Sequence, residues 1–393
     1  MNEANNPFSP GAGSPPPELA GRSAILGQAE MIFQRAQNGR HFRSFMLVGL
    51  RGVGKTVLLS KIADLAEARG LQVAQIEAPE GKRLGELLAP ELRRILLKMN
   101  VGANVADKSR KALNALRNFV GKFKIAVGDF EVTLSSEGGL ADSGDFETDL
   151  ASLLVAIGEA AREKNTALVL LIDEMQYLEE SDFAALIMAL HKMSQKTLPV
   201  VLVGAGLPQL VGNAGRAKSY AERLFDYPAV GPLSLEEATR AVRVPLEAEG
   251  CDITEDGMAA MNAITEGYPF FLQAWGYAVW NGAKECPIDL AVVNEVTPSV
   301  ISMLDKSFFR VRFDRLTPRE KDYVRAMADM GAGPHRSGDI AIELGRSLSS
   351  LAPLRASLIK KGMVYSPAHG DTAFTVPLFD QFLKRAMPRT LNG

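Results

Sequence analysis

The sequence predicts an α/β fold in which helices cover both faces of a five-stranded parallel sheet. From about residue 19 to residue 233, apolar runs alternate with amphipathic stretches, as expected for strands that alternate with helices. Beyond residue 233 the patterns are helical, until two short extended pieces near the C-terminus. We expect the five strands at residues 45–48, 71–76, 167–172, 200–203 and 229–233.

The helix expected after the first strand shows how this alternation arises. In "KTVLLSKIADLAEARG", the side chains of Val57, Leu58, Ile62 and Leu65 share one helical face. The helix is expected to stop at Gly70, because glycine is the usual residue just past a helix C-terminus. Together with its two flanking strands, this helix predicts a βαβ unit.

The chain is long enough for two or three domains, since it has 393 residues. Residues 1–18 are rich in Pro, Gly, Ser and Asn, which predicts a disordered tail. We assign residues 19–233 to the sheet domain, with a helix and a hairpin inserted at 101–145. A helical domain is expected at 234–309 and a C-terminal domain at 310–393.

Two capping patterns mark the starts of helices in the second half of the chain. Ser234 with Glu237 forms a capping box, and so does Thr317 with Glu320, with Pro318 at the first helical position. After the second box we expect a short helix, a longer helix, and the extended pieces "MVYS" and "AFTV". Three helices and a hairpin are the plan of a winged helix-turn-helix.

Charge and cysteine content restrict the class of protein. The formal net charge is −2, so no global field favours nucleic acid or membrane surfaces. Cys251 and Cys286 show neither a zinc pattern nor a disulfide framework, and we expect two buried thiols in a reducing compartment. The sequence begins without a secretory signal pattern and has no apolar run of about 18 residues, so we expect a cytoplasmic protein without a membrane partner.

The stretch "GLRGVGKT" at residues 49–56 follows the first predicted strand directly and predicts a phosphate-binding loop. Glycines leave room for backbone amides to surround an anion, and the next helix directs its positive end at the phosphates. Lys55 supplies a positive charge, and Thr56 offers a hydroxyl to Mg²⁺. The residues expected to hold the nucleotide are Gly49, Leu50, Arg51, Gly52, Val53, Gly54, Lys55, Thr56 and Val57.

A second buried strand supplies the acidic groups that such a loop needs. The run "ALVLLIDEMQYL" is apolar up to Asp173 and Glu174, as expected for a strand covered on both faces. Asp173 is placed to hold Mg²⁺, and Glu174 to polarise the attacking water. The expected ligands are therefore ATP and Mg²⁺, and the expected catalytic residues are Lys55 and Glu174.

With these motifs the chain resembles an AAA+ ATPase of the group that contains the origin-recognition initiators and the archaeal-type ATPases related to signalling NTPases. "GLRGVGKT" matches the Walker A motif and "LVLLIDEMQ" the Walker B motif, and the resemblance runs from about residue 21 to residue 385. It implies a P-loop NTPase sheet of the AAA+ type, a helical lid and a C-terminal winged helix.

The resemblance also implies roles for residues outside the two motifs. Gly21 and Arg22 match the segment that lines the adenine pocket, and Pro269 in "EGYPFFLQ" matches an element near the base and ribose. A plain helix boundary explains Pro269 equally well. Arg223 in "SYAERLFDY" matches the arginine finger that reaches a neighbouring subunit, which would require a homo-oligomer. Capping of a helix C-terminus and pairing with Glu222 are the alternatives for this side chain.

Two departures from the family pattern concern the sensing of the γ-phosphate. "VVLVGAGLPQL" has Gly204, Ala205 and Gly206 where many relatives have a polar residue. The lid lacks the family's Gly-Ala-Arg sensor, and its Arg240 and Arg243 are expected in solvent. Both departures predict slower hydrolysis without affecting nucleotide binding.

The C-terminal domain carries an excess of positive charge. From residue 310 onward there are 14 Arg and Lys against 8 Asp and Glu, or about +6, which leaves about −8 for the rest of the chain. This asymmetry favours contact with the phosphates of double-stranded DNA, although winged helices on ATPases also dock proteins. The residues expected to reach DNA are Ser349, Ser350, Arg355, Lys360 and Lys361.

Two functions follow from these observations. The first is a nucleotide-driven switch in which Mg²⁺-dependent ATP hydrolysis is coupled to DNA binding or remodelling through the winged helix. The second is a signalling NTPase with slow turnover that regulates a protein partner and does not bind DNA. Salt-dependent DNA binding separates the two.

Overall fold

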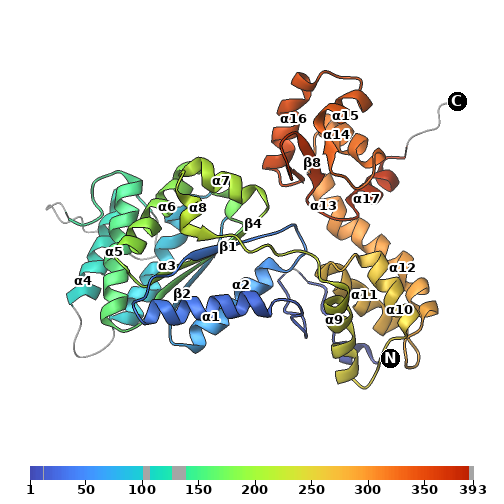
Figure 1. Ribbon diagram of the computed structural model, residues 1–393, viewed down its shortest axis with the longest axis horizontal. Helices are drawn as coiled ribbons and strands as arrows, with labels where there is room; N and C mark the ends of the chain where they lie inside the picture. The colour runs from blue at the N-terminus through green and yellow to red at the C-terminus, as the bar shows by residue number, and fades with distance from the viewer. Residues whose placement is uncertain (12, 101–106, 126–138, 389–393) are drawn as a thin grey trace. The chain divides into compact units, whose positions relative to one another are not determined.

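The computed structural model describes residues 1–11, 13–100, 107–125 and 139–388 (Figure 1). Contacts divide the chain into two compact units. The sheet unit comprises Arg22–Gly49 and Lys55–Val230, and the helical unit comprises Met1–Gly21, Leu50–Gly54 and Gly231–Gly393. Within the described ranges, no helix combines the length and the apolar character needed to cross a membrane.

The sheet unit contains the expected five-stranded parallel sheet, with strand order β2-β3-β4-β1-β5. Every residue of β3 and of β4 is buried, which explains why both strands appear in the sequence as continuous apolar runs. The predicted α/β class is confirmed. The strands are β1 (Ser44–Val48), β2 (Gln72–Glu77), β3 (Leu168–Asp173), β4 (Val200–Gly206) and β5 (Phe225–Asp226).

The fifth strand lies earlier in the chain than predicted. We expected it at residues 229–233, whereas β5 is Phe225–Asp226 and Ala229 forms only an isolated bridge with Val48. Pro228 precedes this bridge and has no N–H to donate to a strand ladder. The β5 side chain Phe225 is buried, so the pairing with β1 is anchored there.

Helices cover both faces of the sheet (Figure 1). Helix α2 follows β1 and lies on one face beside α1, whereas α5 and α6 cover the other, where Leu168, Leu170 and Ile172 join the main core. Right-handed crossovers between parallel strands require such a division. The helices are α1 (Ser23–Gln37), α2 (Lys55–Ala68), α3 (Leu84–Met99), α4 (Asp107–Lys122), α5 (Phe146–Glu163), α6 (Glu180–Gln195), α7 (Gln209–Ala217) and α8 (Ala221–Leu224).

The predicted insertion contributes a packed helix to the sheet unit. Helix α4 buries its apolar face, and the ring of Phe119 lies 5.6 Å from that of Phe146 on α5. The hairpin expected after this helix falls largely on residues 126–138, which lie outside the described residues.

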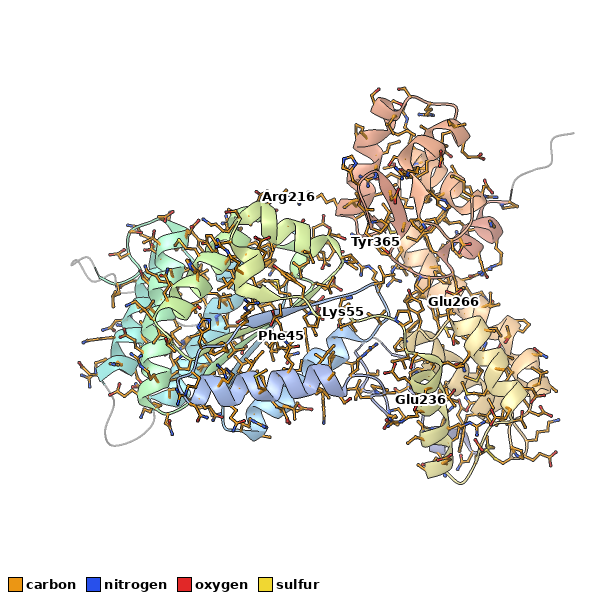
Figure 2. The ribbon with its side chains drawn as sticks, in the orientation of Figure 1. Phe45, Lys55, Arg216, Glu236, Glu266 and Tyr365 are labelled. Carbon is orange, nitrogen blue, oxygen red and sulfur yellow. A yellow bond between two sulfur atoms is a disulfide. The ribbon has the colours of Figure 1, made fainter. Side chains whose placement is uncertain are left out.

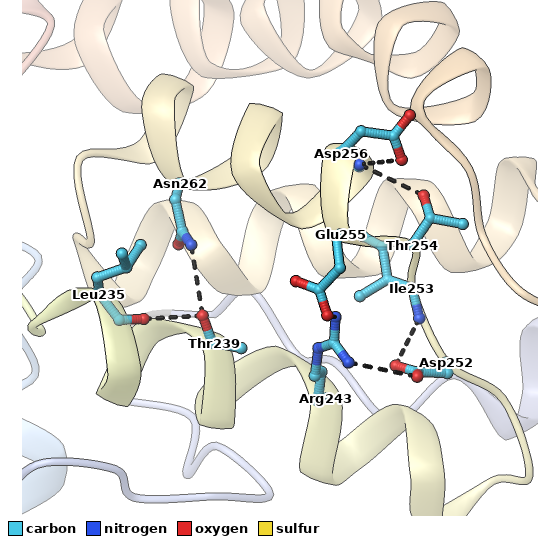
Figure 3. Close-up of polar contacts among 10 residues, drawn as sticks. Leu235, Thr239, Arg243, Asp252, Ile253, Thr254, Glu255, Asp256 and Asn262 are labelled. Carbon is cyan, nitrogen blue, oxygen red and sulfur yellow. Dashed lines mark hydrogen bonds and ion pairs between the residues drawn. The ribbon is translucent and has the colours of Figure 1, made fainter.

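In the helical unit, four helices follow the predicted Ser234–Glu237 capping box, which is present. They are α9 (Leu235–Ala248), α10 (Glu255–Thr265), α11 (Pro269–Gly282) and α12 (Leu290–Leu304). Figure 3 shows polar contacts that join α9 to the start of α10. Arg243 pairs with Asp252 at 3.5 Å and with Glu255 at 2.7 Å. The Arg243 side chain is only 22% exposed and so is not the solvent-facing cation expected, whereas Arg240 pairs with Glu18 at 2.8 Å and stays 60% exposed, as expected.

The two cysteines form a disulfide, which the sequence analysis did not predict. Cys251 and Cys286 are bonded, with their Cα atoms 5.6 Å apart. The bond links the α9–α10 connection to the α11–α12 connection, where Ile253 and Ile288 form a parallel bridge. The prediction of two thiols was wrong because a separation of 35 residues gives no sign that these two connections lie side by side.

The prediction of a disordered tail was also wrong. The short helix η1 (Glu3–Asn5) lies in this segment, and the Asn6 amide donates to the Tyr277 carbonyl at 3.0 Å. Phe8 is 2% exposed and fills the space beside Gly276 of α11. The composition of the tail did not suggest enough apolar area for packing, but the single buried ring of Phe8 supplies it.

The C-terminal elements form a small domain with a three-stranded antiparallel sheet of order β6-β8-β7. The predicted boundary at residue 309 does not separate compact units, because the Phe309 ring stacks on the Phe382 ring at 5.3 Å. The elements are η3 (Asp305–Phe309), α13 (Arg310–Phe313), α14 (Pro318–Asp329), β6 (His335–Arg336), α15 (Ser337–Glu343), α16 (Leu348–Lys360), β7 (Val364–Tyr365), β8 (Asp371–Phe374) and α17 (Phe379–Ala386).

Glu320 is the polar centre of this domain. It completes the predicted capping box with Thr317, and its carboxylate accepts hydrogen bonds from the Lys361 ammonium and the Ser357 hydroxyl, both at 2.7 Å. Burial acts to raise the pKa of Glu320, but these donors and the Thr317 amide outweigh it and lower the pKa to about 2.

Replacing Glu320 by Gln should lower the free energy of unfolding by about 1–2 kcal/mol at neutral pH, because charge-assisted hydrogen bonds are lost. In the wild type the folded pKa of about 2 lies below the ordinary value of 4.5. The contribution is therefore complete above about pH 4.5 and is lost as the pH falls toward 2. Urea unfolding near pH 7 and near pH 3 measures both effects. Equal pH dependence in wild type and Glu320→Gln would contradict the prediction.

Candidate functional site

The predicted phosphate loop connects β1 to α2. Phe45, in the fully buried part of β1, and Lys55, the first residue of α2, are labelled in Figure 2. Gly52 and Gly54 have φ values of 82° and 89°, a region that favours glycine. The Lys55 side chain is buried, and its ammonium donates to the Gly49 carbonyl at 2.9 Å. The positive charge of Lys55 is thus held beside the loop, where it is available to a bound anion.

The carboxyl end of β3 lies beside the start of α2. The Thr56 hydroxyl donates to Asp173 Oδ2 at 2.6 Å, and the Glu174 amide donates to Asp173 Oδ1 at 2.8 Å. Because the carboxyl ends of parallel strands meet at one edge of a sheet, residues 117 positions apart become neighbours. Burial raises the pKa of Asp173, while the Thr56 and Glu174 hydrogen bonds oppose that shift.

Glu174 occupies the turn that follows β3. Its backbone is left-handed, with φ 53° and ψ 35°, and it precedes the short helix η2 (Met175–Tyr177). A non-glycine residue in this region costs about 1 kcal/mol or more, and such strain is concentrated at functional sites. Gln176 Nε2 donates to Glu174 Oε2, and Gln176 Oε1 accepts from the Leu207 amide at 3.0 Å. The sequence analysis assigned no role to Gln176.

The glycines at the end of β4 are explained by this turn. A Cβ atom added to Gly204 would overlap Met175 Sδ. One added to Gly206 would lie 2.8 Å from Gln176 Oε1 and 2.9 Å from Leu210 Cδ2. The strand therefore has glycine where the family pattern led us to expect a polar side chain, because side chains from η2 already fill that space.

Comparisons with known proteins agree with this geometry. Residues 18–203 match the AAA ATPase domain, and residues 306–383 match a domain of unknown function (DUF8462). A Walker-type ATPase of Pyrococcus abyssi, PABY2304, has a similar structure, with 17% identity and a TM-score of 0.59 over 93% of this chain and 96% of that one. The fold is that of an AAA+ P-loop NTPase.

Two further solved structures are less similar. RuvB of Thermotoga maritima, a Holliday junction branch migration motor, shows 14% identity and a TM-score of 0.43 over 93% of this chain and 95% of that one. ORC1 of Aeropyrum pernix, solved in complex with DNA, shows 15% identity and a TM-score of 0.44 over 94% of each chain. No curated protein matches the sequence.

Arg223, the predicted arginine finger, lies in the last turn of the short helix α8, where the alternative of a basic residue at a helix C-terminus also places it. Its side chain is exposed, and within the described residues no acidic group pairs with it, so the alternative pairing with Glu222 is not found. No hydrogen bond or ion pair of the described residues joins its guanidinium to Lys55 or Asp173. The structure leaves Arg223 outside the cluster formed by the other predicted catalytic residues.

The residues expected around the base lie at the beginnings of helices. Gly21 has φ 69° and lies against the Glu237 carboxylate, whereas Arg22 is buried and precedes α1. Pro269 occupies the first turn of α11, so it marks the helix boundary that we considered as an alternative. The next residue, Phe270, donates its amide to the Gly52 carbonyl of the loop at 3.2 Å.

Two of the residues expected to reach DNA make contacts inside the C-terminal domain. The Arg355 guanidinium donates to the Thr372 hydroxyl at 2.8 Å and to the Asp371 carbonyl at 2.7 Å, which ties α16 to β8. Lys361 donates to Glu320 at 2.7 Å. The sequence analysis identified both side chains by their charge, but each serves the packing of its own domain.

The remaining three DNA candidates are on the surface. All three side chains are exposed. Ser349 and Ser350 lie in the first turn of α16, and Lys360 is the last residue of the helix. The Ser350 hydroxyl donates to the Ser347 carbonyl at 2.8 Å, a local contact at the helix start. Lys360 is therefore the one exposed cation among the five residues that we predicted.

Gly204→Ala should lower the free energy of unfolding by about 1–3 kcal/mol, because the added methyl group overpacks a buried contact with Met175. Gly215→Ala in α7 is the matched control, since a Cβ atom there meets no atom within 4 Å. The control should be neutral or stabilising by up to about 1 kcal/mol, because alanine favours helix. Denaturant unfolding measures both, and equal stability of the two variants would contradict the packing explanation.

Proposed function

We propose that this protein binds ATP with Mg²⁺ at the loop of residues 49–56 and hydrolyses the γ-phosphate. The observation that carries the proposal is the 2.6 Å hydrogen bond between the Thr56 hydroxyl and the Asp173 carboxylate, beside the buried Lys55 ammonium. A hydroxyl and a carboxylate are the hard oxygen donors that Mg²⁺ takes together with phosphate oxygens. The fit to the P-loop fold supports the same assignment.

The chain's own groups suit the binding of a polyphosphate. Gly52 and Gly54 keep side chains away from the loop, so backbone amides can face an anion. The Lys55 ammonium, now on the Gly49 carbonyl, has three protons and can also donate to phosphate oxygens. Asp173 is a carboxylate whose pKa burial raises, and a neighbouring cation would offset the cost of its charge.

Glu174 is the general base in this proposal. Its carboxylate would accept a proton from the attacking water while the phosphoryl group passes to that water, giving ADP and phosphate. Mg²⁺, when bound, supplies charge neutralisation at the phosphate oxygens. Glu174 is held by the strained turn after β3 and by the Gln176 amide, so its position is fixed by the fold.

We propose further that Arg223 acts on the nucleotide of a neighbouring copy of the chain. Its guanidinium is exposed and has no acidic partner among the described residues, as a group that works on another molecule would require. A planar guanidinium is suited to phosphate oxygens because it donates two parallel hydrogen bonds. This role makes a homo-oligomer the active form.

For the C-terminal domain we propose a winged helix that contacts double-stranded DNA. The order α14, β6, α15, α16, β7, β8 contains three helices and a hairpin, and the chain from residue 310 carries about +6. Lys360 is exposed at the last turn of α16. In this proposal the nucleotide state controls the presentation of the domain to DNA.

A second candidate function is regulation of a protein partner with slow ATP turnover. Two observations favour it: Arg355 and Lys361 are committed to internal contacts, and Ile342 and Leu348 are 80% and 54% exposed around the connection between α15 and α16. Exposed apolar side chains at such a site suit a protein surface better than a phosphate backbone.

Lys55→Ala should weaken ATP binding about 30- to 300-fold, because charge-assisted hydrogen bonds to the phosphates are lost. Glu174→Gln should keep ATP affinity within about threefold and lower turnover about 100- to 1,000-fold. Calorimetry with Mg²⁺ and a phosphate-release assay measure the two effects. Lys61→Ala, an exposed lysine of the same helix, is the control. Wild-type ATP affinity in Lys55→Ala would overturn the site assignment.

The DNA proposal predicts binding to a duplex that falls steeply with salt, because each phosphate contact releases a counterion. Lys360→Ala should weaken binding and reduce the salt slope by about 1. Fluorescence anisotropy over a salt series measures this, with Lys164→Ala in the sheet unit as the control. Absence of salt-dependent binding would reject DNA and leave the protein partner as the function of this domain.

A further inference from the structure

Gln176 makes a bridge that neither motif accounts for. Its side chain joins the Glu174 carboxylate, at the end of β3, to the Leu207 amide, directly after β4. We infer that Gln176 is a positioning residue that fixes the Glu174 carboxylate for ATP hydrolysis, in place of the polar side chain expected at the end of β4. This inference rests on the proposed ATPase function.

The partners of Gln176 determine which way its amide faces. The Leu207 backbone N–H can only donate, so the Gln176 oxygen must face it, at 3.0 Å. The Gln176 nitrogen then faces Glu174, where it can only donate, and an ionised carboxylate can only accept. The orientation of the Gln176 amide is therefore fixed by the chemistry of both partners.

The turn that carries the two side chains is itself firmly held. Met175 is fully buried, the Tyr177 amide donates to the Glu174 carbonyl at 3.0 Å, and the Leu178 amide donates to the Met175 carbonyl at 3.1 Å. Glu174 and Gln176 are thus presented by one tight turn of backbone. A bridge from this turn to β4 restricts the Glu174 side chain without help from a residue of β4.

The end of β4 is shaped to admit this bridge. At Gly206 a Cβ atom would lie 2.8 Å from Gln176 Oε1, and at Gly204 it would overlap Met175. A side chain at residue 206 would therefore crowd Gln176, and one at residue 204 would crowd Met175, where these side chains now stand. The turn after β3 supplies the polar group, and the glycines of β4 leave space for it. These glycines therefore do not by themselves predict slow hydrolysis.

Gln176→Leu removes both hydrogen bonds with a side chain of similar size. We expect the turnover number for ATP to fall about 10- to 100-fold, since a positioned general base contributes about 100- to 10,000-fold and is only loosened here. ATP affinity should stay within about threefold of wild type, because Gln176 donates to Glu174 and not to the loop. Gln195→Leu, at the end of α6, is the matched control and should leave both quantities unchanged.

Gln176→Glu separates positioning of the base from a structural role. This variant keeps an oxygen for the Leu207 amide but loses the donor toward Glu174, so two carboxylates face each other. Because Glu174 loses the amide that holds it, turnover should again fall about 10- to 100-fold while ATP affinity stays within about threefold. It also serves if Gln176→Leu does not fold, since the contact with β4 is retained.

The possible outcomes distinguish this inference from the function on which it depends. If wild type hydrolyses ATP and Glu174→Gln does not, then wild-type turnover in the Gln176 variants overturns the positioning role alone. A loss of turnover matched by an equal loss of ATP affinity also overturns it, because that pattern indicates damage to the whole site. If wild type does not hydrolyse ATP, the proposed function fails and the inference fails with it.

Discussion

The hydrogen bond between Thr56 and Asp173 is the contact on which the candidate site depends. It joins the first turn of the helix after β1 to the last residue of β3, two segments that are 117 residues apart. The sheet order places β4 between β1 and β3, so all three strand ends open at one edge. Lys55 directly precedes Thr56 in the chain, and Glu174 directly follows Asp173. The same hydrogen bond therefore brings these two residues to one edge of the sheet.

At the carboxyl ends of β3 and β4, the backbone conformation of one residue restricts the residue types at neighbouring positions. A left-handed residue at Glu174 directs the chain into a tight turn, whose Met175 and Gln176 side chains occupy the space above β4. That occupancy requires glycine at residues 204 and 206. The departure from the family pattern is therefore a consequence of packing, and the polar group that a strand residue would supply comes from the neighbouring turn.

The C-terminal domain uses its charges mainly to hold itself together. The Glu320 carboxylate accepts hydrogen bonds from the Lys361 ammonium and from two further donors. The Arg355 guanidinium joins α16 to the hairpin through its own hydrogen bonds. Such networks stabilise a small domain whose sheet strands are only two to four residues long. An excess of positive residues in a segment therefore overstates the charge that the segment offers to a partner.

The loop, both acidic residues and the parallel sheet could be predicted from the sequence, because each leaves a local pattern: glycine spacing, a continuous apolar run, and alternation of strand and helix. Capping boxes at Ser234 and Thr317 were equally local, and both are present. The disulfide, the packed N-terminal segment and the Gln176 bridge could not be predicted in this way. Each depends on which connections and strand ends lie side by side, since Cys251 meets Cys286, Phe8 meets Gly276, and Gln176 meets Leu207 only after the chain has folded. Local sequence thus specified the chemical groups of this protein, whereas the tertiary structure decided their partners, because partners distant in sequence leave no periodic signal in either segment.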